Sequence, residues 1–496
     1  MVFCRATLGV YRRKLILLAF LSVILYILAT QSAIKLLSPH SAEKRQLQAC
    51  LREYMDTLQP YAFLNNQTII LDNLTQIGLS IVNLTRPKVM LTTDHANSKL
   101  TQEANLTSDK DANLTMAYTN NWVGFPDLRN INCTAMLTFR GNNSQYPQGV
   151  NRVQDQQLLN ISADCSEFIH RFGFQRYPTA TQEEKDFPLA FIIVFHTSLD
   201  QVLFLLRAIY HPHNVYCLHP DRKVNALMLG AVLSAARCLP NVFVAGRLED
   251  VVYAGFSRLM ADINCMSDLM GHPVQWRYVI NMPGQQFPLR TNLEMVRVLK
   301  SFNGSNDIEG LHSDKALLKH RYIYRHVVNT NAKTGEKAMA RTGATNPSPP
   351  HKLPVTKGSA YGSFTRGFVQ FVLNDPVAKD LLEWSRDLLS PDEYFWATLN
   401  YNDVIDVPGG TKNTSTSRKW MTSSSLWRGD NKVICYSKFL HDVCIYTPED
   451  LPALVSRDFL FANKLHIDHH PAALHCLDEM VVNLTHSRLV RNFGSR

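Results

Sequence analysis

Two adjacent carboxylates, Asp392 and Glu393, stand in the stretch SPDEYFW at residues 390–396. A carboxylate that packs against aromatic side chains loses water, which raises its pKa and makes it a better general base than an exposed one. The same stretch also suits the start of a helix, with Ser390 as N-cap, Pro391 in the first turn and the acids near the positive end of the helix dipole. Both interpretations can hold together, because a helix N-terminus that lines a cleft can fix a base in place.

Apolar runs of two kinds alternate upstream of this stretch. The strand patterns and the helical patterns between them cover residues 187–196, 199–210, 214–221, 227–238, 241–246, 256–270 and 276–282. Strands that alternate with helices predict a largely parallel α/β sheet, which binds ligands at the carboxyl ends of its strands. Asp221 stands at such an end. Neither a G-x-G-x-x-G nor a G-x-x-x-x-G-K-[ST] phosphate loop occurs, which disfavours dinucleotide binding and P-loop chemistry.

A charge-free apolar run at residues 15–34 follows several basic residues. Its length suits a helix that crosses about 30 Å of hydrocarbon, and basic residues mark the cytosolic side. A cleaved signal peptide is the alternative, but its apolar core is usually shorter. We therefore expect a cytoplasmic tail at 1–14, an uncleaved transmembrane signal-anchor at 15–34, a glycosylated stem at 35–130 and a folded lumenal domain at 131–496.

The composition fits a basic lumenal protein. The chain of 496 residues is 45% hydrophobic and 19% charged, so it can bury a large core. Its net charge of +9 comes from scattered Lys and Arg residues, without a basic groove interleaved with aromatic side chains. The sequence therefore does not predict a nucleic-acid partner.

N-glycosylation sequons agree with a lumenal location. They begin at Asn66, Asn73, Asn83, Asn105, Asn113, Asn132, Asn142, Asn160, Asn303, Asn413 and Asn483. Six of them lie between residues 66 and 132, which indicates a glycosylated stem.

Cysteine usage indicates an oxidising compartment. Of ten cysteines, Cys4 precedes the apolar run and Cys50 lies in the expected stem. The other eight form an even set, which favours four disulfides whose connectivity spacing alone cannot decide: Cys133, Cys165, Cys217, Cys238, Cys265, Cys435, Cys444 and Cys476. No C-x-x-C pair occurs, so a structural zinc site has little support.

Several blocks carry a family resemblance in one order along the chain. They are FPLA (187–190), YCLHPD (216–221), NVFVAGRLEDVVYA (241–254), WRYVINMPGQQFPLRTNLEMVRVLK (276–300), KGSAY (357–361), SPDEYFWATL (390–399), DVCIY (442–446) and FANK (461–464). Together they resemble the core-2/I-branching β-1,6-N-acetylglucosaminyltransferase family, whose wider relatives include peptide O-xylosyltransferases. The resemblance covers roughly residues 131–480.

The resemblance implies a GT-A-like glycosyltransferase domain, a Rossmann-like mixed sheet flanked by helices, held in the Golgi membrane by one helix. It implies a hexosyltransferase that moves GlcNAc from UDP-GlcNAc, with inversion, to the 6-hydroxyl of GalNAc in mucin-type O-glycans on a glycoprotein acceptor. The alternatives are I-branching of poly-lactosamine, xylosyl transfer to protein, or a catalytically weak glycan-binding lumenal protein.

The resemblance assigns the general base to Glu393, with Asp392 as a cap or a partner of that base, or alternatively as a residue that holds the acceptor. It also implies that basic side chains replace a metal ion at the departing diphosphate, so no metal is expected. The sequence agrees in that its one Asp-x-Asp, at 109–111, lies in the stem. Lys464 matches one of the basic positions, whereas His441 stands where relatives have Arg and cannot make the bidentate contact of a guanidinium.

For the donor, the family pattern places Val194, His196 and Asp221 around the uridine. The alternatives are that Val194 belongs to the core and that His196 is a buried histidine with satisfied hydrogen bonds.

For the acceptor, Glu309 matches a sugar-contacting acid and Lys315 matches a basic residue approximately. Tyr361 and Trp427 offer aromatic faces to sugar rings, although either also suits a core. Gln286 departs from the family, because relatives carry an acid directly before Phe-Pro; that acid either supports a turn or orients the acceptor loop.

The resemblance also implies a disulfide pattern. The expected pairs are Cys133–Cys476, Cys165–Cys238, Cys217–Cys265 and Cys435–Cys444. Cys50 stays unpaired in this pattern, so it either links two copies into a homodimer through the stem or remains a free or capped thiol.

Overall fold

The computed structural model describes residues 128, 130–138, 146–147, 149–311, 313, 315–412, 419–429, 434–488 and 491. All of them belong to one compact unit, Leu114–Arg496. The expected cytoplasmic tail and signal-anchor, nearly all of the stem, Cys50 and seven sequons lie outside the described residues; these sequons are Asn66, Asn73, Asn83, Asn105, Asn113, Asn142 and Asn413. Among the helices that are described, none is long and apolar enough to cross a bilayer.

A five-stranded sheet forms the centre of the domain, with strand order β3-β2-β1-β4-β8. Its strands are β1 Leu189–Phe195, β2 Val215–Pro220, β3 Val242–Val244, β4 Tyr278–Pro283 and β8 Ser363–Thr365. The first four strands in this order run parallel, and β8 pairs antiparallel with β4. The predicted parallel-rich α/β sheet is therefore confirmed, and the antiparallel edge strand adds to it.

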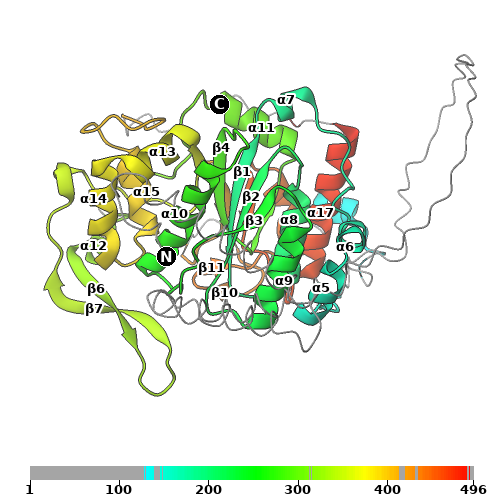
Figure 1. Cartoon of the computed structure of the whole chain (residues 1–496), viewed down its shortest axis with the longest axis horizontal. Coiled ribbons are helices and arrows are strands. Elements are labelled where there is room, and N and C mark those ends of the chain that lie inside the picture. The colour runs from blue at the N-terminus through cyan, green and yellow to red at the C-terminus, as the bar shows by residue number, and fades with distance from the viewer. Residues whose placement is uncertain are drawn as a thin grey trace, which may run out of the picture. The chain divides into compact units, whose positions relative to one another are not determined.

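Helices cover both faces of this sheet (Figure 1). They are α8 Leu199–Ile209, α9 Ala226–Arg237 and α11 Asn292–Ser301 on one face, and α10 Phe256–Gly271, α13 Arg366–Asn374, α14 Pro376–Trp384 and α15 Asp392–Asn400 on the other. Alternate side chains of β1 enter the two cores, Phe191 and Ile193 on the first face and Ala190 and Ile192 on the second. This double burial explains why β1 reads as a continuous apolar run rather than as an alternating one.

A second, three-stranded sheet lies beside a third core. It consists of β5 Gln286–Pro288, β12 Phe461–Asn463 and β9 Ser423–Ser425, in the order β5-β12-β9. Strand β12 runs antiparallel to β5 and parallel to β9. The core beside it includes residues of α4 Cys133–Thr138, α16 Leu451–Val455 and α17 Pro471–Ser487.

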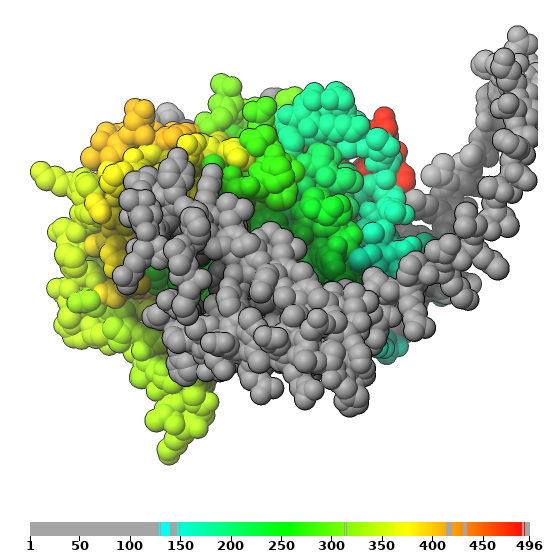
Figure 2. Space-filling model, in the orientation of Figure 1, coloured from blue at the N-terminus to red at the C-terminus, as the bar shows by residue number. Residues whose placement is uncertain are grey.

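Two hairpins complete the described strands. The longer one, β6 Tyr324–Thr330 with β7 Lys337–Thr345, projects from the domain in Figure 1 and in the space-filling view of Figure 2. The shorter one pairs β10 Phe439–Leu440 with β11 Val443–Cys444. Its two turn residues, His441 and Asp442, both have positive φ, 51° and 60°, as a tight two-residue hairpin turn requires.

Short helices fill the remaining described segments. They are α5 Asp155–Ser162, α6 Cys165–Phe172, α7 Gln182–Lys185 and α12 His320–Ile323, with 3-10 turns at Pro350–Lys352, Ser385–Asp387 and Pro448–Asp450.

Four disulfides are present, and they are the four pairs that the resemblance implied. They join Cys133 to Cys476, Cys165 to Cys238, Cys217 to Cys265 and Cys435 to Cys444. The first ties α4 to α17 across a sequence separation of 343 residues, and the last closes the β10–β11 hairpin. The sequon asparagines among the described residues are all exposed: Asn132, Asn160, Asn303 and Asn483.

Candidate active site

The SPDE stretch forms the start of α15, which begins at Asp392 with Pro391 in the N-cap position. The predicted N-cap role of Ser390 is wrong, and no side chain caps this helix. The reason is the backbone: Ser390 has a φ of 55°, its N–H donates to the carbonyl of Ala254 at 2.7 Å, and its carbonyl accepts from the N–H of Glu393 at 3.0 Å. These bonds fix the turn that presents Glu393.

The carboxylate of Glu393 lies between two cations. Its Oε2 atom lies 3.0 Å from the guanidinium of Arg321 and 2.9 Å from Nζ of Lys357. The Glu393 side chain is 21% exposed, so an acceptor can reach it from solvent. Both ion pairs use the same oxygen, which leaves Oε1 as the atom that can accept a proton from a substrate.

Asp392 is the more deeply buried acid of the pair. Burial raises the pKa of Asp392 to about 6, against the opposing effect of the nearby Arg258 guanidinium. Arg258 makes an ion pair with Asp262 at 2.7 Å and lies over the ring of Tyr361. The loss of water that we expected for these acids therefore raises the pKa of Asp392, whereas the side chain of Glu393 stays partly exposed to solvent.

Glu309 lies close to Glu393. Burial raises the pKa of Glu309, the Lys357 ammonium opposes this, and the negative charge of Glu393 adds to it. The backbone explains the proximity: Gly358 donates its N–H to the carbonyl of Glu393 at 2.7 Å, and a Cβ on Gly358 would lie 2.1 Å from the carbonyl oxygen of Glu309. Only glycine allows the KGSAY segment to pass between these two elements.

The other expected acceptor residues are not all in this cluster. Tyr361 belongs to it, since its ring faces Arg258 and the negative charge of Asp392 influences its hydroxyl. Lys315 is exposed, and no ion pair or hydrogen bond joins it to the described residues of the cluster. Trp427 is 53% exposed and bridges to Val443 of the β10–β11 hairpin.

Three basic side chains gather at the expected diphosphate position. Lys464, directly after β12, is buried, donates from Nζ to the carbonyl of Leu440 at 3.0 Å, and has its pKa lowered by burial. Burial, the Lys464 charge and His196 all lower the pKa of His441, so these groups lie near one another. The His441 ring also packs against Tyr253, with ring centroids 4.5 Å apart.

The expected uridine residues lie at the carboxyl ends of the parallel strands. His196 directly follows β1 and is exposed, so the alternative of a buried histidine is wrong. Val194 lies near the end of β1, and its side chain packs in the second core. Asp221 directly follows β2, is buried, and makes an ion pair with Lys223 at 2.9 Å.

Gln286 lies in β5 and is fully buried. Its Nε2 donates to Oγ of Ser423 in β9 at 3.0 Å, and its Oε1 has no partner among the described residues. This contact joins two strands that flank β12, so the side chain supports the small sheet.

Some side chains of the cluster carried no sequence prediction, namely Arg321, Lys357, Tyr253 and Arg258. Lys357 and Tyr253 stand in the KGSAY and NVFVAGRLEDVVYA blocks, so the family resemblance could have identified them as candidate site residues. Arg321 lies in α12, in a stretch without a motif, and it meets Glu393 across 72 residues of sequence.

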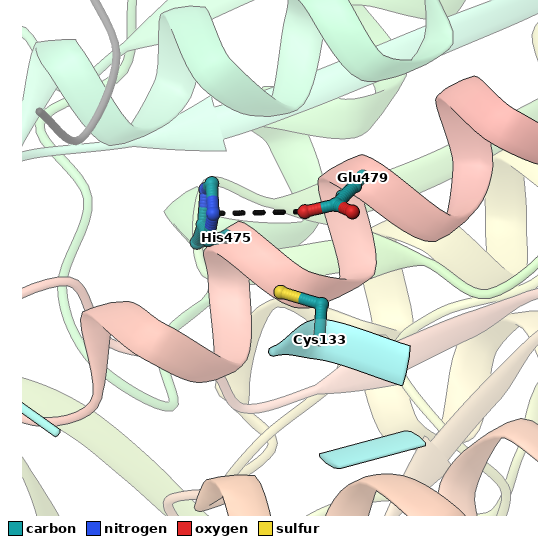
Figure 3. A group of neighbouring side chains, drawn as sticks. All are labelled: Cys133, His475 and Glu479. Atoms are coloured by element: carbon teal, nitrogen blue, oxygen red, sulfur yellow. Dashed lines mark ion pairs between the residues drawn. The ribbon is translucent and has the colours of Figure 1, made fainter. Parts of the chain in front are cut away.

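One group of side chains from α4 and α17 has the composition of a metal site (Figure 3). His475 and Glu479 form an ion pair one turn apart at 3.7 Å, beside Cys133. The Cys133 sulfur is in the disulfide with Cys476, so it cannot act as a thiolate ligand. Only two ligands remain, and we assign no metal to this group.

Comparison with known proteins adds independent information. The family model described as "Core-2/I-Branching enzyme" matches residues 189–455, which include Glu393 and every residue of its cluster. A mouse N-acetyllactosaminide β-1,6-N-acetylglucosaminyl-transferase is 39% identical over 344 residues, 68% of this chain and 83% of that relative.

The names of two further relatives give a β-1,3-galactosyl-O-glycosyl-glycoprotein as the acceptor, in place of the N-acetyllactosaminide of the mouse enzyme. A human β-1,3-galactosyl-O-glycosyl-glycoprotein β-1,6-N-acetylglucosaminyltransferase is 38% identical over 342 residues, 66% of this chain and 77% of that relative. A Danio rerio relative, β-1,3-galactosyl-O-glycosyl-glycoprotein β-1,6-N-acetylglucosaminyltransferase 4, is 35% identical over 363 residues, 71% of this chain and 84% of that relative.

Proposed function

The chain belongs to the Core-2/I-branching enzyme family, and from this premise we propose that it is a β-1,6-N-acetylglucosaminyltransferase of mucin-type O-glycans. It moves GlcNAc from UDP-GlcNAc, with inversion, to the 6-hydroxyl of GalNAc. The observation that carries the proposal is the Glu393 carboxylate, accessible from solvent on a helix start and held by Arg321 and Lys357. The proposed fold type of this mixed α/β glycosyltransferase domain is GT-A-like.

Glu393 is the proposed general base. It removes the proton of the acceptor 6-hydroxyl while that oxygen attacks the anomeric carbon in line, and UDP leaves from the opposite face. The bond from the anomeric carbon to the diphosphate oxygen breaks as the new glycosidic bond forms, which inverts the configuration. Glu309 and Tyr361, beside Glu393, are the proposed acceptor contacts, with Trp427 and Lys315 at the periphery.

The departing diphosphate needs positive charge, and Lys464 and His441 are the proposed sources. Their gathering beside His196 supports this assignment. Because two basic side chains take the role that a divalent cation has in many sugar transferases, we propose that the reaction is metal-independent. Val194, His196 and Asp221 would contact the uridine at the strand ends.

The proposed location is the Golgi membrane, with residues 15–34 as a single anchor, a short cytosolic tail, a glycosylated stem and the catalytic domain from about residue 131 in the lumen. The exposed sequons at Asn132, Asn160, Asn303 and Asn483 support a lumenal domain. A homodimer through Cys50 is part of this proposal.

I-branching is the second candidate function. It is favoured by the similarity to mouse and human N-acetyllactosaminide enzymes, at 39% and 40% identity, against 38% for the human O-glycan enzyme.

The deciding experiment offers the full chain UDP-GlcNAc with Galβ1-3GalNAc-O-aryl or N-acetyllactosamine, each in EDTA and in Mn²⁺. We expect a β-1,6-linked product on the first acceptor in EDTA. Transfer only to N-acetyllactosamine would establish I-branching instead, and activity only with Mn²⁺ would contradict metal independence. A second arm replaces UDP-GlcNAc by UDP-xylose, and a third measures binding of both acceptors by calorimetry. Transfer only from UDP-xylose, or acceptor binding without any transfer, would contradict the proposed function.

A further inference from the structure

Lys357 is held in a fixed place between two elements. Its carbonyl accepts the N–H of Leu311 at 2.7 Å, and the next residue, Gly358, donates to the carbonyl of Glu393 at 2.7 Å. The Lys357 side chain is 14% exposed, compared with 27% for Arg321, the other cation on Glu393. A lysine usually keeps its ammonium in water, so one this buried needs a specific partner.

The partners of Lys357 are two carboxylates. Its Nζ lies 2.9 Å from Oε2 of Glu393, and its charge lowers the pKa of Glu309 against the effects of burial and of Glu393. Two carboxylates that face each other cannot both ionise easily unless a cation stands between them. Lys357 acts on both carboxylates, because its Nζ is paired with Glu393 and its positive charge favours the ionised form of Glu309.

We infer that Lys357 is a positioning residue of the transfer reaction. It fixes Oε2 of Glu393, so that Oε1 faces the acceptor hydroxyl, and its charge favours the ionised form of Glu309, which accepts hydrogen bonds from sugar hydroxyls. This inference rests on the proposed function, in which Glu393 is the base and Glu309 contacts the acceptor. Lys357 itself touches neither the donor nor the reacting atoms.

The test compares Lys357→Met and Lys357→Arg in the full chain, with Lys333→Met as the matched control. Lys333 lies at the exposed end of the β6–β7 hairpin and belongs to no part of the site. We expect Lys357→Met to lower kcat about 10-fold or more and to raise the acceptor KM several-fold. The dissociation constant of UDP-GlcNAc should stay within about 2-fold of wild type, because Lys357 is not a donor contact. Lys357→Arg should recover most of kcat, and Lys333→Met should behave as wild type.

A second readout is the pH dependence of the acceptor KM. Loss of the ammonium removes the effect that lowers the Glu309 pKa, so this carboxyl takes up its proton at a higher pH. The acceptor KM of Lys357→Met should therefore begin to rise at a higher pH than that of wild type as the pH falls. A merely structural lysine would not produce this shift.

Two results would overturn the inference. One is a Lys357→Met enzyme with the kcat and acceptor KM of wild type. The other is a parallel loss of thermal stability, UDP-GlcNAc binding and activity that Lys357→Arg does not restore. A wild type that transfers GlcNAc to neither acceptor would contradict the proposed function first and this inference with it, so the two failures are distinguishable.

Discussion

Adjacent acids in one motif have different environments here. Asp392 is buried among Arg258, Asp262 and Tyr361, and burial raises its pKa to about 6, whereas Glu393 is partly exposed between Arg321 and Lys357. A base must meet the acceptor, so only Glu393 has the access that the proposed chemistry needs. The role of Asp392 is structural in this arrangement, since its charge faces the interior.

Glu393→Gln should lower kcat by about 10²- to 10⁴-fold, because the amide keeps the shape of the side chain but cannot accept the proton. The dissociation constant of UDP-GlcNAc should change little. Initial-rate kinetics with Galβ1-3GalNAc-O-aryl, together with calorimetric titration of UDP-GlcNAc, measure both quantities.

The matched control is Glu383→Gln in α14, an exposed acid that pairs with Arg386. It should retain wild-type kcat. A Glu393→Gln enzyme with more than about a tenth of wild-type kcat would mean that another group, or water, removes the acceptor proton.

Residue roles were predictable only as far as motifs extend. The SPDE and FANK blocks predicted Glu393 as the base and Lys464 as a diphosphate contact. The structure gives Glu393 a partly exposed position on a helix start and bonds Lys464 to the carbonyl of Leu440, while both roles stay predictions. Arg321 could not be predicted, because its contact with Glu393 joins residues 72 apart and depends on how α12 packs against α15. The N-cap prediction for Ser390 failed because a bond to Ala254 holds its backbone in a left-handed conformation that no local pattern reveals.

At the scale of elements, the disulfide-closed β10–β11 hairpin determines the electrostatics of the proposed donor site. Its turn holds His441 near Lys464 and His196, and the Lys464 ammonium is bonded to Leu440, the residue before the turn. Burial, the Lys464 charge and the neighbouring His196 lower the pKa of His441, and Asp442 opposes them. In the free protein His441 is therefore mostly neutral at pH 7.

A bound diphosphate reverses this balance, because an anion beside the imidazole favours its charged form. UDP-GlcNAc binding should then take up a proton, and its affinity should increase as the pH falls from about 8 to about 5.5. The donor itself does not titrate in this range. Calorimetry in buffers of different ionisation enthalpy measures the proton uptake directly.

His441→Arg should bind UDP-GlcNAc with much less dependence on pH, because a guanidinium stays charged throughout this range. His196→Gln is the companion variant, since His196 is the other histidine near the diphosphate position, and it should retain most of the dependence. Equal affinity at both ends of the pH range, with no proton uptake, would show that His441 does not contact the diphosphate.

The KGSAY segment depends on a close backbone approach. Gly358→Ala should destabilise the protein by about 1–3 kcal/mol or more and lower activity, since its Cβ would lie 2.1 Å from the Glu309 carbonyl oxygen and force Lys357 and Glu309 apart. Denaturant unfolding and acceptor KM report these two effects. Gly343→Ala in β7 is the control, because no atom lies within 4 Å of its added Cβ. Wild-type stability in Gly358→Ala would mean that this backbone can separate at little cost.

For the whole molecule, the parallel core was predictable because β1, β2 and β4 are buried on both faces and each helix has an apolar stripe. The predicted elements at residues 187–282 agree with β1 to β4 and α8 to α10 to within two residues at every end. The small β5-β12-β9 sheet was not predictable from periodicity, since its strands have three residues each and come from distant parts of the chain. The stability of that region depends on long-range contacts instead.

Among the four disulfides, Cys133–Cys476 closes the longest loop. It joins α4 to α17, the first and last described helices, across 343 residues, and the chain-entropy model gives the largest stabilisation to the longest loop. Replacing both cysteines by Ala, which leaves no unpaired thiol, should lower the free energy of unfolding by about 2–5 kcal/mol. Denaturant unfolding with the other three disulfides intact measures this loss.

The comparison variant replaces Cys435 and Cys444, which are only 9 residues apart. Loss of this disulfide should lower the free energy of unfolding less, because the loop that it closes is smaller. It should weaken UDP-GlcNAc binding, because it releases the hairpin that places His441 beside Lys464. The Cys133/Cys476 variant should show the opposite pattern, with reduced stability and unchanged donor affinity below its unfolding range. If both variants lost stability and donor binding in the same proportion, the two disulfides would not have separate roles, and the hairpin could not be treated as an independently positioned part of the donor site.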